Sequence, residues 1–385
     1  MPVPSLRFSI RRLAVVVLLA AIGAGVWFFV LRDDGGSEES GKDRGKAERG
    51  PISDDPLVRK MSVAEQVDQV LMLGFAGTSP DAPSVADLAH SDVGAVIVRA
   101  ENWEGVETGK KLVAELGQGE GIPPLVAASQ EGGIYRSFAD LPPAERALDI
   151  GREGSIDAAR VWAQTTSKAL VGAGFHLNLF PVADVATLDS PFAGRAFSDD
   201  PAEVTAFTDA SLEGCEDAGI ACAPLHFPGL GAASQDTAEG PATVSSPLEI
   251  LTTRDLVPFQ AASRKAPAMV LSLALYPDFD PIVPGALTPS LATGLLRDEI
   301  GFKGVAISDD LGAGAVSATL SVDEAAVRAL AAGTDLVQIG APEEAEGVAG
   351  AIERAVGAGD VPKERLAEAA ERVIALKREL GLIAG

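Results

Sequence analysis

Short runs of apolar residues alternate with longer amphipathic segments along most of the chain. Eight of these runs, rich in Val, Ile, Leu and Ala, have the length and composition of strands that are buried on both faces. The predicted strands cover residues 71–77, 93–98, 124–130, 175–182, 221–228, 268–276, 304–309 and 336–340. Between them, apolar residues recur with a helical period, which predicts helices over 155–172, 201–219, 289–299 and 322–332.

Strands that alternate with helices indicate an α/β protein with a parallel sheet. The number of strands and the span of sequence favour a closed (β/α)₈ TIM-type barrel over an open doubly wound sheet. A last helix over 362–382 is expected to pack against the barrel, with Glu364, Arg365, Glu368, Glu371 and Arg372 on its exposed face. In such a barrel the loops that follow the strands build the functional face, so polar residues at the strand ends are the candidates for function.

Residues 13–31 form an uninterrupted apolar stretch that is long enough to cross a bilayer as a helix. Arg7, Arg11 and Arg12 precede it, which predicts a cytoplasmic N-terminus and export of the rest of the chain. A cleaved signal peptide is the alternative, although the apolar run is long for one.

A segment rich in Gly, Ser and charged residues follows this stretch and has the composition of a disordered spacer. We therefore expect a single-pass protein of the cell membrane with an extracytoplasmic barrel. The predicted parts are a cytoplasmic N-terminus (1–12), a transmembrane anchor (13–31), a disordered linker (32–55) and the barrel domain (56–385).

Composition and charge limit what the chain can bind. With 47% hydrophobic residues, the chain can bury a large core, and its net charge of −24 argues against binding nucleic acid. Only three histidines are present, which makes a His-rich metal site improbable, and no metal is expected. The two cysteines, Cys215 and Cys222, are either two small buried residues or one disulfide, because an exported domain lies in an oxidising compartment.

One loop carries the most specific pattern of the chain. Residues 225–239 leave a predicted strand and read Leu-His-Phe-Pro-Gly-Leu-Gly-Ala-Ala-Ser-Gln-Asp-Thr-Ala-Glu. They resemble the signature loop of glycoside hydrolase family 3, in the branch of bacterial β-N-acetylhexosaminidases, where Lys-His-Phe-Pro-Gly-His-Gly-Asp-Thr is followed by Asp-Ser-His. Further motifs of that family appear in the same order: Gln130-Glu131-Gly132-Gly133, Pro181-Val182-Ala183-Asp184-Val185, Arg195-Ala196-Phe197-Ser198-Asp199-Asp200-Pro201 and Ile307-Ser308-Asp309-Asp310-Leu311.

The resemblance extends from Met61 to the C-terminus and implies the single-domain form of the family, which uses no cofactor. It also implies a retaining mechanism, in which Asp309 stands at the position of the nucleophile. In the family a His, oriented by an Asp two residues earlier, donates the proton. Asp236 matches that Asp, but Ala238 occupies the position of the His. The absence of a general acid typically slows such a reaction about 10²- to 10⁴-fold.

Residues that would bind the sugar have also changed. Arg195 and His226 match substrate-binding residues of the family, whereas Ser129 stands in place of an Asp and Leu225 in place of a Lys. Four further polar positions of the family are occupied by Ile134, Ser137, Leu230 and Ala232. Glu239 follows the vacant His position and is a candidate substitute acid, if apolar neighbours raise its pKa; the alternative is a solvated loop residue.

Two functions remain open. The first is a membrane-tethered glycosidase that hydrolyses O-glycosyl bonds in cell-wall glycans containing N-acetylglucosamine, with activity impaired by Ala238. The second is a non-catalytic pseudoenzyme that binds a glycan, a peptidoglycan fragment or a partner protein at the barrel mouth. The resemblance supplies the substrate class in both.

Overall fold

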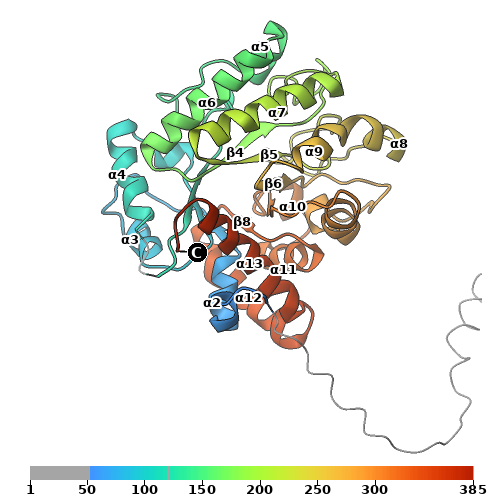
Figure 1. The fold of residues 1–385 in the computed structure, drawn as a ribbon. Helices are drawn as coiled ribbons and strands as arrows, with labels where there is room; N and C mark the ends of the chain where they lie inside the picture. The colour runs from blue at the N-terminus through green and yellow to red at the C-terminus, as the bar shows by residue number, and fades with distance from the viewer. Residues whose placement is uncertain (1–52, 119–120, 385) are drawn as a thin grey trace, which may run out of the picture. The chain divides into compact units, whose positions relative to one another are not determined.

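The computed structural model describes residues 53–118 and 121–384, which belong to a single compact unit (Figure 1). Among these residues no helix combines the length and apolar character that crossing a bilayer requires. The predicted anchor (13–31) and nearly all of the predicted linker (32–55) lie outside the described residues. Ser53 and Asp55, at the end of that linker, bind the last helix: Ser53 Oγ donates to Glu371 Oε2 at 2.7 Å, and Asp55 pairs with Arg378.

All eight predicted strands are present, each shorter than its apolar run, and every pair is parallel. Flanking apolar residues belong to the turns at both strand ends, where the ladder hydrogen bonds stop. The strands are β1 (Leu71–Leu73), β2 (Ala95–Ile97), β3 (Leu125–Ala128), β4 (Leu177–Val182), β5 (Ala221–Leu225), β6 (Ala268–Leu271), β7 (Val305–Ser308) and β8 (Val337–Ile339).

The sheet curls into a TIM-barrel-like arrangement. Six strands pair in the order β5-β4-β3-β2-β1-β8, and β6 pairs with β7. Two parallel bridges connect these groups: Phe227 with Leu271, beside β5 and β6, and Ile307 with Leu336, beside β7 and β8. The strand ends that carry the candidate residues therefore face one another at one end of the curled sheet.

Alternation along the strands divides the apolar residues between two cores. In β6, Ala268 and Val270 belong to the inner core, whereas Met269 and Leu271 belong to the layer between sheet and helices. This alternation is expected because successive strand residues point to opposite faces. Val373 and Leu376, from the last helix, also join the inner core, so that helix closes the end of the sheet opposite to the candidate site.

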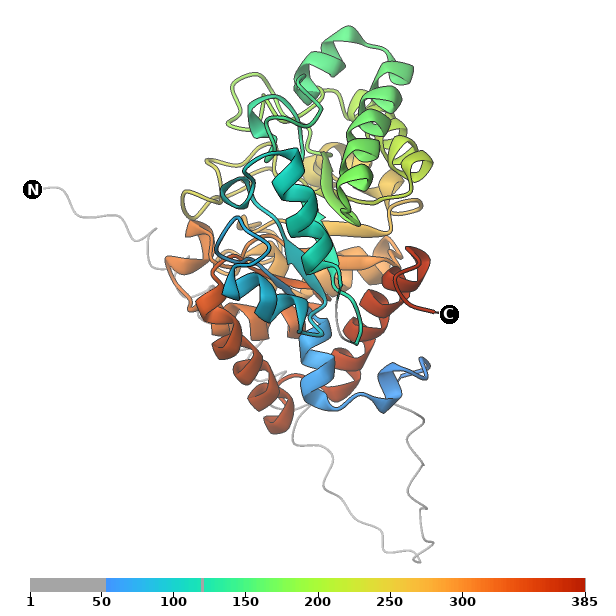
Figure 2. The same cartoon turned by 90° about the vertical axis from the view of Figure 1, so that its left-hand side faces the viewer.

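Helices cover the outer face of the sheet, and all five predicted helices are present, although the segment predicted over 289–299 forms a π-helix. Figure 1 shows α6 and α7 side by side, and Figure 2 shows α13 beside α2. The α-helices are α2 (Val63–Gln69), α3 (Pro83–Ala89), α4 (Val106–Leu116), α5 (Ala147–Glu153), α6 (Ile156–Ala173), α7 (Pro201–Ala218), α8 (Leu248–Ile250), α9 (Val257–Ala262), α10 (Gly314–Ser317), α11 (Val322–Ala332), α12 (Ala345–Ala358) and α13 (Lys363–Glu379). Shorter or wider turns are η1 (Val58–Lys60), η2 (Ala100–Asn102), η3 (Gly133–Tyr135), η5 (Gly285–Leu287) and η7 (Pro342–Glu344), with π-helices at η4 (Leu251–Asp255) and η6 (Ser290–Glu299).

The buried carboxylate of Asp335 attaches α13 to the barrel. It forms ion pairs with Arg297 and Arg365, and accepts a hydrogen bond from Arg372 Nη1 at 2.9 Å. The expectation that Arg365 and Arg372 lie on an exposed face was therefore wrong. An amphipathic pattern places arginines on the polar face of a helix, but it does not reveal a buried acid that faces them.

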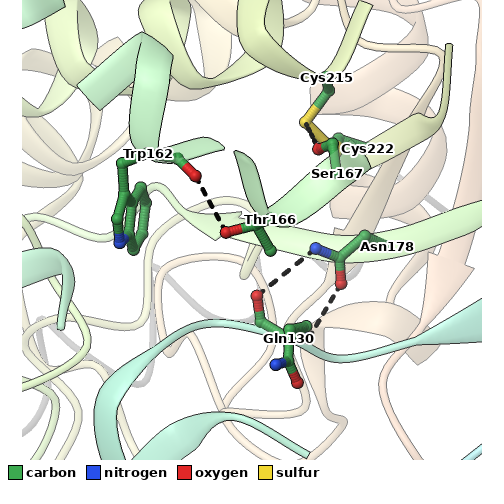
Figure 3. The surroundings of a disulfide bond; sticks show 7 residues. All are labelled: Gln130, Trp162, Thr166, Ser167, Asn178, Cys215 and Cys222. Carbon is green, nitrogen blue, oxygen red and sulfur yellow. Dashed lines mark hydrogen bonds between the residues drawn. A yellow bond between two sulfur atoms is a disulfide. The ribbon is translucent and has the colours of Figure 1, made fainter. Parts of the chain in front are cut away.

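The two cysteines form a disulfide, which was the alternative left open by the sequence (Figure 3). Cys215 lies near the end of α7 and Cys222 lies in β5, so the bond closes the turn between these two elements. Both residues are buried, and Ser167 of α6 lies against Cys215 with 3.5 Å between Oγ and Sγ. In the same region Asn178 Oδ1 accepts the backbone N–H of Gln130 at 2.9 Å, which links β4 to the end of β3 (Figure 3).

Lys377 is a buried cation at the closed end of the barrel. Its Nζ donates to Gln69 Oε1 at 2.8 Å and to the Val93 carbonyl at 3.2 Å. Burial lowers the pKa of Lys377 to about 7, and the charge of Asp92 opposes this shift only in part.

We expect Lys377 to make the stability of the fold rise with pH. Above pH 7 the unfolded chain retains a proton on this lysine that the folded chain has released, so the free energy of unfolding should increase by about 2 kcal/mol between pH 7 and pH 9. Urea unfolding of wild type and Lys377→Met at both pH values tests this, because the variant lacks this contribution. Lys363→Met, at an exposed position of α13, is the matched control and should retain the wild-type pH dependence.

Candidate active site

A cavity of about 430 Å³ opens where the strands end. Its wall combines charged groups from the loops with apolar side chains from the strands. The lining residues are Ile97, Val98, Arg99, Ser129, Glu131, Ser137, Leu179, Arg195, Leu225, His226, Asp236, Thr237, Ala238, Val270, Asp309, Asp310, Gly312, Ala313 and Gln338. Every predicted site residue except Glu239 lines this cavity, so the fold brings together residues that are up to 180 positions apart in the sequence.

Glu131 and Arg195 form the central ion pair of the cavity. Arg195 Nε and Nη2 donate to the two carboxylate oxygens of Glu131, each at 2.8 Å. The guanidinium carbon lies 5.9 Å from the ring centre of Tyr135 and 5.8 Å from that of Phe192. Burial alone would lower the pKa of Arg195, but the charge and hydrogen bonds of Glu131 outweigh it and raise the pKa above its usual range. Arg195 is therefore a fixed, permanently charged donor.

His226 bridges this arginine to a buried acid. Its Nδ1 lies 2.8 Å from Asp184 Oδ2, and its Nε2 lies 3.3 Å from Arg195 Nη2. A guanidinium can only donate, so Nε2 must accept and the proton of the ring must be on Nδ1. Asp184 also accepts the backbone N–H of Leu230 at 2.7 Å, which fixes its orientation. In this arrangement Nδ1 of His226 donates to Asp184 and Nε2 accepts from Arg195.

This tautomer can be observed directly. In ¹⁵N NMR spectra of histidine-labelled protein at neutral pH, we expect Nδ1 of His226 to be the protonated nitrogen and Nε2 the unprotonated one. Arg195→Met removes the donor to Nε2 and should introduce the other tautomer or a mixture. A wild-type His226 protonated at Nε2 would contradict the proposed arrangement.

Asp309 follows β7 and presents one free carboxylate oxygen to the cavity. Its Oδ1 accepts the backbone N–H of Asp310 at 2.8 Å, whereas Oδ2 accepts no hydrogen bond from the described residues. Asp310 is paired with Arg99 Nη2 at 2.5 Å and accepts the N–H groups of Gly312 and Gly340. A side chain at Gly340 would collide with both partners of that pair, which explains a glycine there.

The loop with the signature pattern folds back onto α10. The carbonyls of Thr237 and Ala238 accept backbone N–H groups of Ala315 and Gly314, at 3.0 and 3.2 Å. Asp236 Oδ1 accepts the N–H of Ala238 at 2.9 Å, and its Oδ2 lies 3.9 Å from Arg195 Nη1. The methyl group of Ala238 therefore lines the cavity beside Asp236. Glu239 is exposed and is not among the lining residues.

Ser129 lies beside the central ion pair. Its Oγ is 3.4 Å from Glu131 Oε1, and its carbonyl accepts from Ser137 Oγ at 2.7 Å. Leu225, next to His226, contributes an apolar surface to the same wall. Two polar lining residues were not predicted from the sequence: Arg99, which follows β2, and Gln338, within β8. Arg99 comes directly after the predicted strand 93–98, which was a usable signal, whereas Gln338 lies in the middle of the predicted strand 336–340 and carried none.

Each carboxylate of the cavity wall has a partner within the chain. Glu131, Asp236 and Asp310 each face an arginine, and Asp309 accepts a backbone N–H. Within residues 53–118 and 121–384, no cluster of three or more His, Cys, Asp and Glu side chains could hold a metal ion. The arrangement offers a free carboxylate oxygen for attack on an electrophilic carbon but no side chain held as a proton donor.

Comparison with known proteins gives concordant results. The sequence model described as "Glycosyl hydrolase family 3 N terminal domain" matches residues 62–376. A β-hexosaminidase of Stenotrophomonas maltophilia is 33% identical over 285 residues, which cover 71% of this chain and 84% of that protein. The solved structure of a glycoside hydrolase family 3 β-N-acetylglucosaminidase from Paenibacillus sp. is 28% identical with a TM-score of 0.79, over 84% of this chain and 64% of that one. A family 3 glycosyl hydrolase from Mycobacterium smegmatis is 27% identical with a TM-score of 0.77, over 83% of this chain and 98% of that one.

Proposed function

The chain belongs to glycosyl hydrolase family 3 and is of the β-N-acetylhexosaminidase type, and we propose that it binds glycans containing N-acetylglucosamine and hydrolyses their glycosidic bonds with impaired efficiency. The main support for this proposal is the cavity itself: Asp309 presents a free oxygen to it, and no side chain of its wall is held as a general acid. The relatives whose names state β-hexosaminidase or β-N-acetylglucosaminidase activity supply the substrate class.

Asp309 acts in the first chemical step. Its free oxygen attacks the anomeric carbon, the bond from that carbon to the leaving oxygen breaks, and a covalent glycosyl ester forms, while the leaving oxygen departs as an alkoxide and takes a proton from water. Water then hydrolyses the ester, which releases the sugar and restores Asp309. Arg195 and His226 lie in the same cavity and are proposed to bind sugar hydroxyls. Arg195 can donate from Nη1, because Nε and Nη2 are occupied by Glu131.

Protonation of the leaving oxygen is the step that is impaired. Asp236 remains where the family has the Asp that orients the catalytic His, but Ala238 can neither donate nor accept a proton. The missing general acid costs about 10²- to 10⁴-fold in rate for an ordinary alkoxide leaving group. A leaving group that is stable as an anion would not suffer this loss. Glu239 as substitute acid remains a prediction, and its exposed position outside the cavity wall does not favour it.

The alternative is a non-catalytic glycan- or partner-binding pseudoenzyme. It is favoured by the replacements at Ser129 and Leu225, which remove two charged groups that the family uses to hold the sugar. Each hydrogen bond lost costs on the order of 1 kcal/mol, and more where a charge assisted it.

The two functions are separated by a single-turnover assay with two aryl β-N-acetylglucosaminides. With the wild-type protein we expect a burst of dinitrophenolate from the dinitrophenyl glycoside, whose leaving group needs no protonation. Asp309→Asn should release none. Ala238→His should restore a proton donor beside Asp236 and accelerate release from the unsubstituted phenyl glycoside by about 10²-fold or more. Ala318→His places the same residue at an exposed position that does not line the cavity, and should leave the rate of release unchanged.

Three results would redirect the proposal. Loss of most activity in Glu239→Ala would identify Glu239 as the proton donor. Binding of N-acetylglucosamine without any burst would establish the pseudoenzyme. Phenol release that survives Asp309→Asn would exclude Asp309 as nucleophile.

We also propose that residues 13–31 anchor the barrel at the outer side of the cell membrane. The apolar span and the preceding arginines support this, and so does the disulfide, because such bonds persist in oxidising compartments. The full chain should remain in membranes after alkaline carbonate extraction, and its barrel should be accessible to protease from outside the cytoplasm. A chain that begins at Ser53, which retains the contacts of Ser53 and Asp55 with α13, should be extracted. Equal extraction of both chains would contradict the anchor.

A further inference from the structure

Gln338 carries an unpaired amide in the wall of the cavity. The residue lies in β8, is 5% exposed, and lines the cavity. Its Oε1 is buried without a hydrogen-bond partner, and among the described residues none pairs with Nε2. The backbone of Gln338 is satisfied, because its N–H donates to Ser308 Oγ at 2.9 Å and its carbonyl accepts from Leu311 at 2.9 Å. Only the side chain is left unpaired.

An unpaired buried amide is costly, because it has lost its hydration without gaining a partner. The other buried side-chain atoms without a partner belong to residues that do not line the cavity: Trp162, Thr208, Asp209, Ser211 and Arg297. Among the described residues with an unpaired buried side-chain atom, Gln338 is thus the one that lines this cavity. Its counterpart at the closed end, Gln69, is fully buried and uses both ends of its amide, with Lys377 and the Asp92 carbonyl.

The surroundings of Gln338 restrict what could satisfy it. Ile97, Leu179, Leu225 and Val270 line the same cavity from other strands and are each nearly fully buried. An amide set in an apolar wall matches a group that is itself an amide with an apolar end. An acetamido group meets this description: its N–H and C=O complement the C=O and N–H₂ of a glutamine, and its methyl group suits an apolar contact.

The strand that carries Gln338 also adjoins the strand that precedes the proposed nucleophile. β8 adjoins β7 through the bridge of Ile307 with Leu336, and the Gln338 N–H is bonded to Ser308, the residue before Asp309. Asp309 attacks C1 of the sugar in the proposed reaction. The substituent on C2 is the ring substituent nearest to C1, so a side chain on the adjacent strand is well placed to contact it.

We propose that Gln338 is a specificity-determining residue that selects a 2-acetamido sugar through a paired amide contact with its C2 substituent. This inference rests on the proposed function, since it requires that the cavity binds the sugar whose C1 faces Asp309. In this proposal the Gln338 amide recognises the sugar without a charge, in a wall where Ser129 and Leu225 stand in place of charged residues of the family.

The test compares wild type with Gln338→Leu, which preserves approximate volume and removes the amide. Binding of N-acetylglucosamine and of glucose to the full chain is measured by calorimetry, together with the thermal unfolding midpoint. Wild type should prefer N-acetylglucosamine. In the variant the affinity for N-acetylglucosamine should fall by about 10- to 100-fold, and that for glucose should change less than about twofold. The unfolding midpoint should be unchanged or higher, because an unpaired polar group has been removed from the wall.

Gln69→Leu is the matched control, because it removes a buried amide whose partners are all within the protein. This variant should unfold at a lower temperature and retain the preference for N-acetylglucosamine. The proposal is overturned if Gln338→Leu weakens both sugars equally, weakens neither, or lowers the unfolding midpoint as Gln69→Leu does. If wild type binds neither sugar, the proposed function fails as well, and the two failures are thereby distinguished.

Discussion

The bidentate pair of Glu131 and Arg195 is the interaction on which the chemistry of the cavity depends. It joins the loop after β3 to the loop after β4, and the two rings that flank the guanidinium leave it one orientation. From that orientation follows the tautomer of His226, because a guanidinium can only donate. Asp184 then accepts a hydrogen bond from the Nδ1–H of the ring. A single ion pair therefore sets the hydrogen-bonding roles of residues from three consecutive strand ends, and it does so without any group from a ligand.

The carboxylates of the cavity wall are held in a similar way. Each of them faces a cation or accepts a backbone N–H group. Asp309 keeps one oxygen free, which suits a nucleophile. A proton donor would have to come from a residue outside this network. In the proposed function Ala238 occupies the position of that residue, so the proton donor is lost through one side chain while the supporting Asp236 is still in place.

The sequence predicted the fold more completely than the site. Eight parallel strands could be predicted because buried strands are continuous apolar runs, and local composition records that directly. The positions of Asp309, Arg195 and His226 could be predicted because motifs mark strand ends. The roles of Arg365, Arg372 and Gln338 could not be assigned, since they depend on what lies opposite in space: a buried Asp335 in the first two cases and the cavity in the third. The disulfide was left open for the same reason, because the distance between Cys215 and Cys222 depends on the turn after α7.

The two ends of the barrel treat buried polar groups in opposite ways. At the closed end Asp335 has three arginine partners and Lys377 donates to Gln69, so these groups find their partners within the chain, although Nε of Arg297 does not. At the open end Gln338 has no protein partner, although a leucine would fit the apolar wall around it at no cost in hydrogen bonds. The other buried side-chain amides of the described residues are paired, and only that of Gln338 is not. The unpaired amide destabilises the fold, and it lies where a ligand would bind. Stability and recognition are thus assigned to opposite ends of the same strands, as the architecture of such barrels leads one to expect.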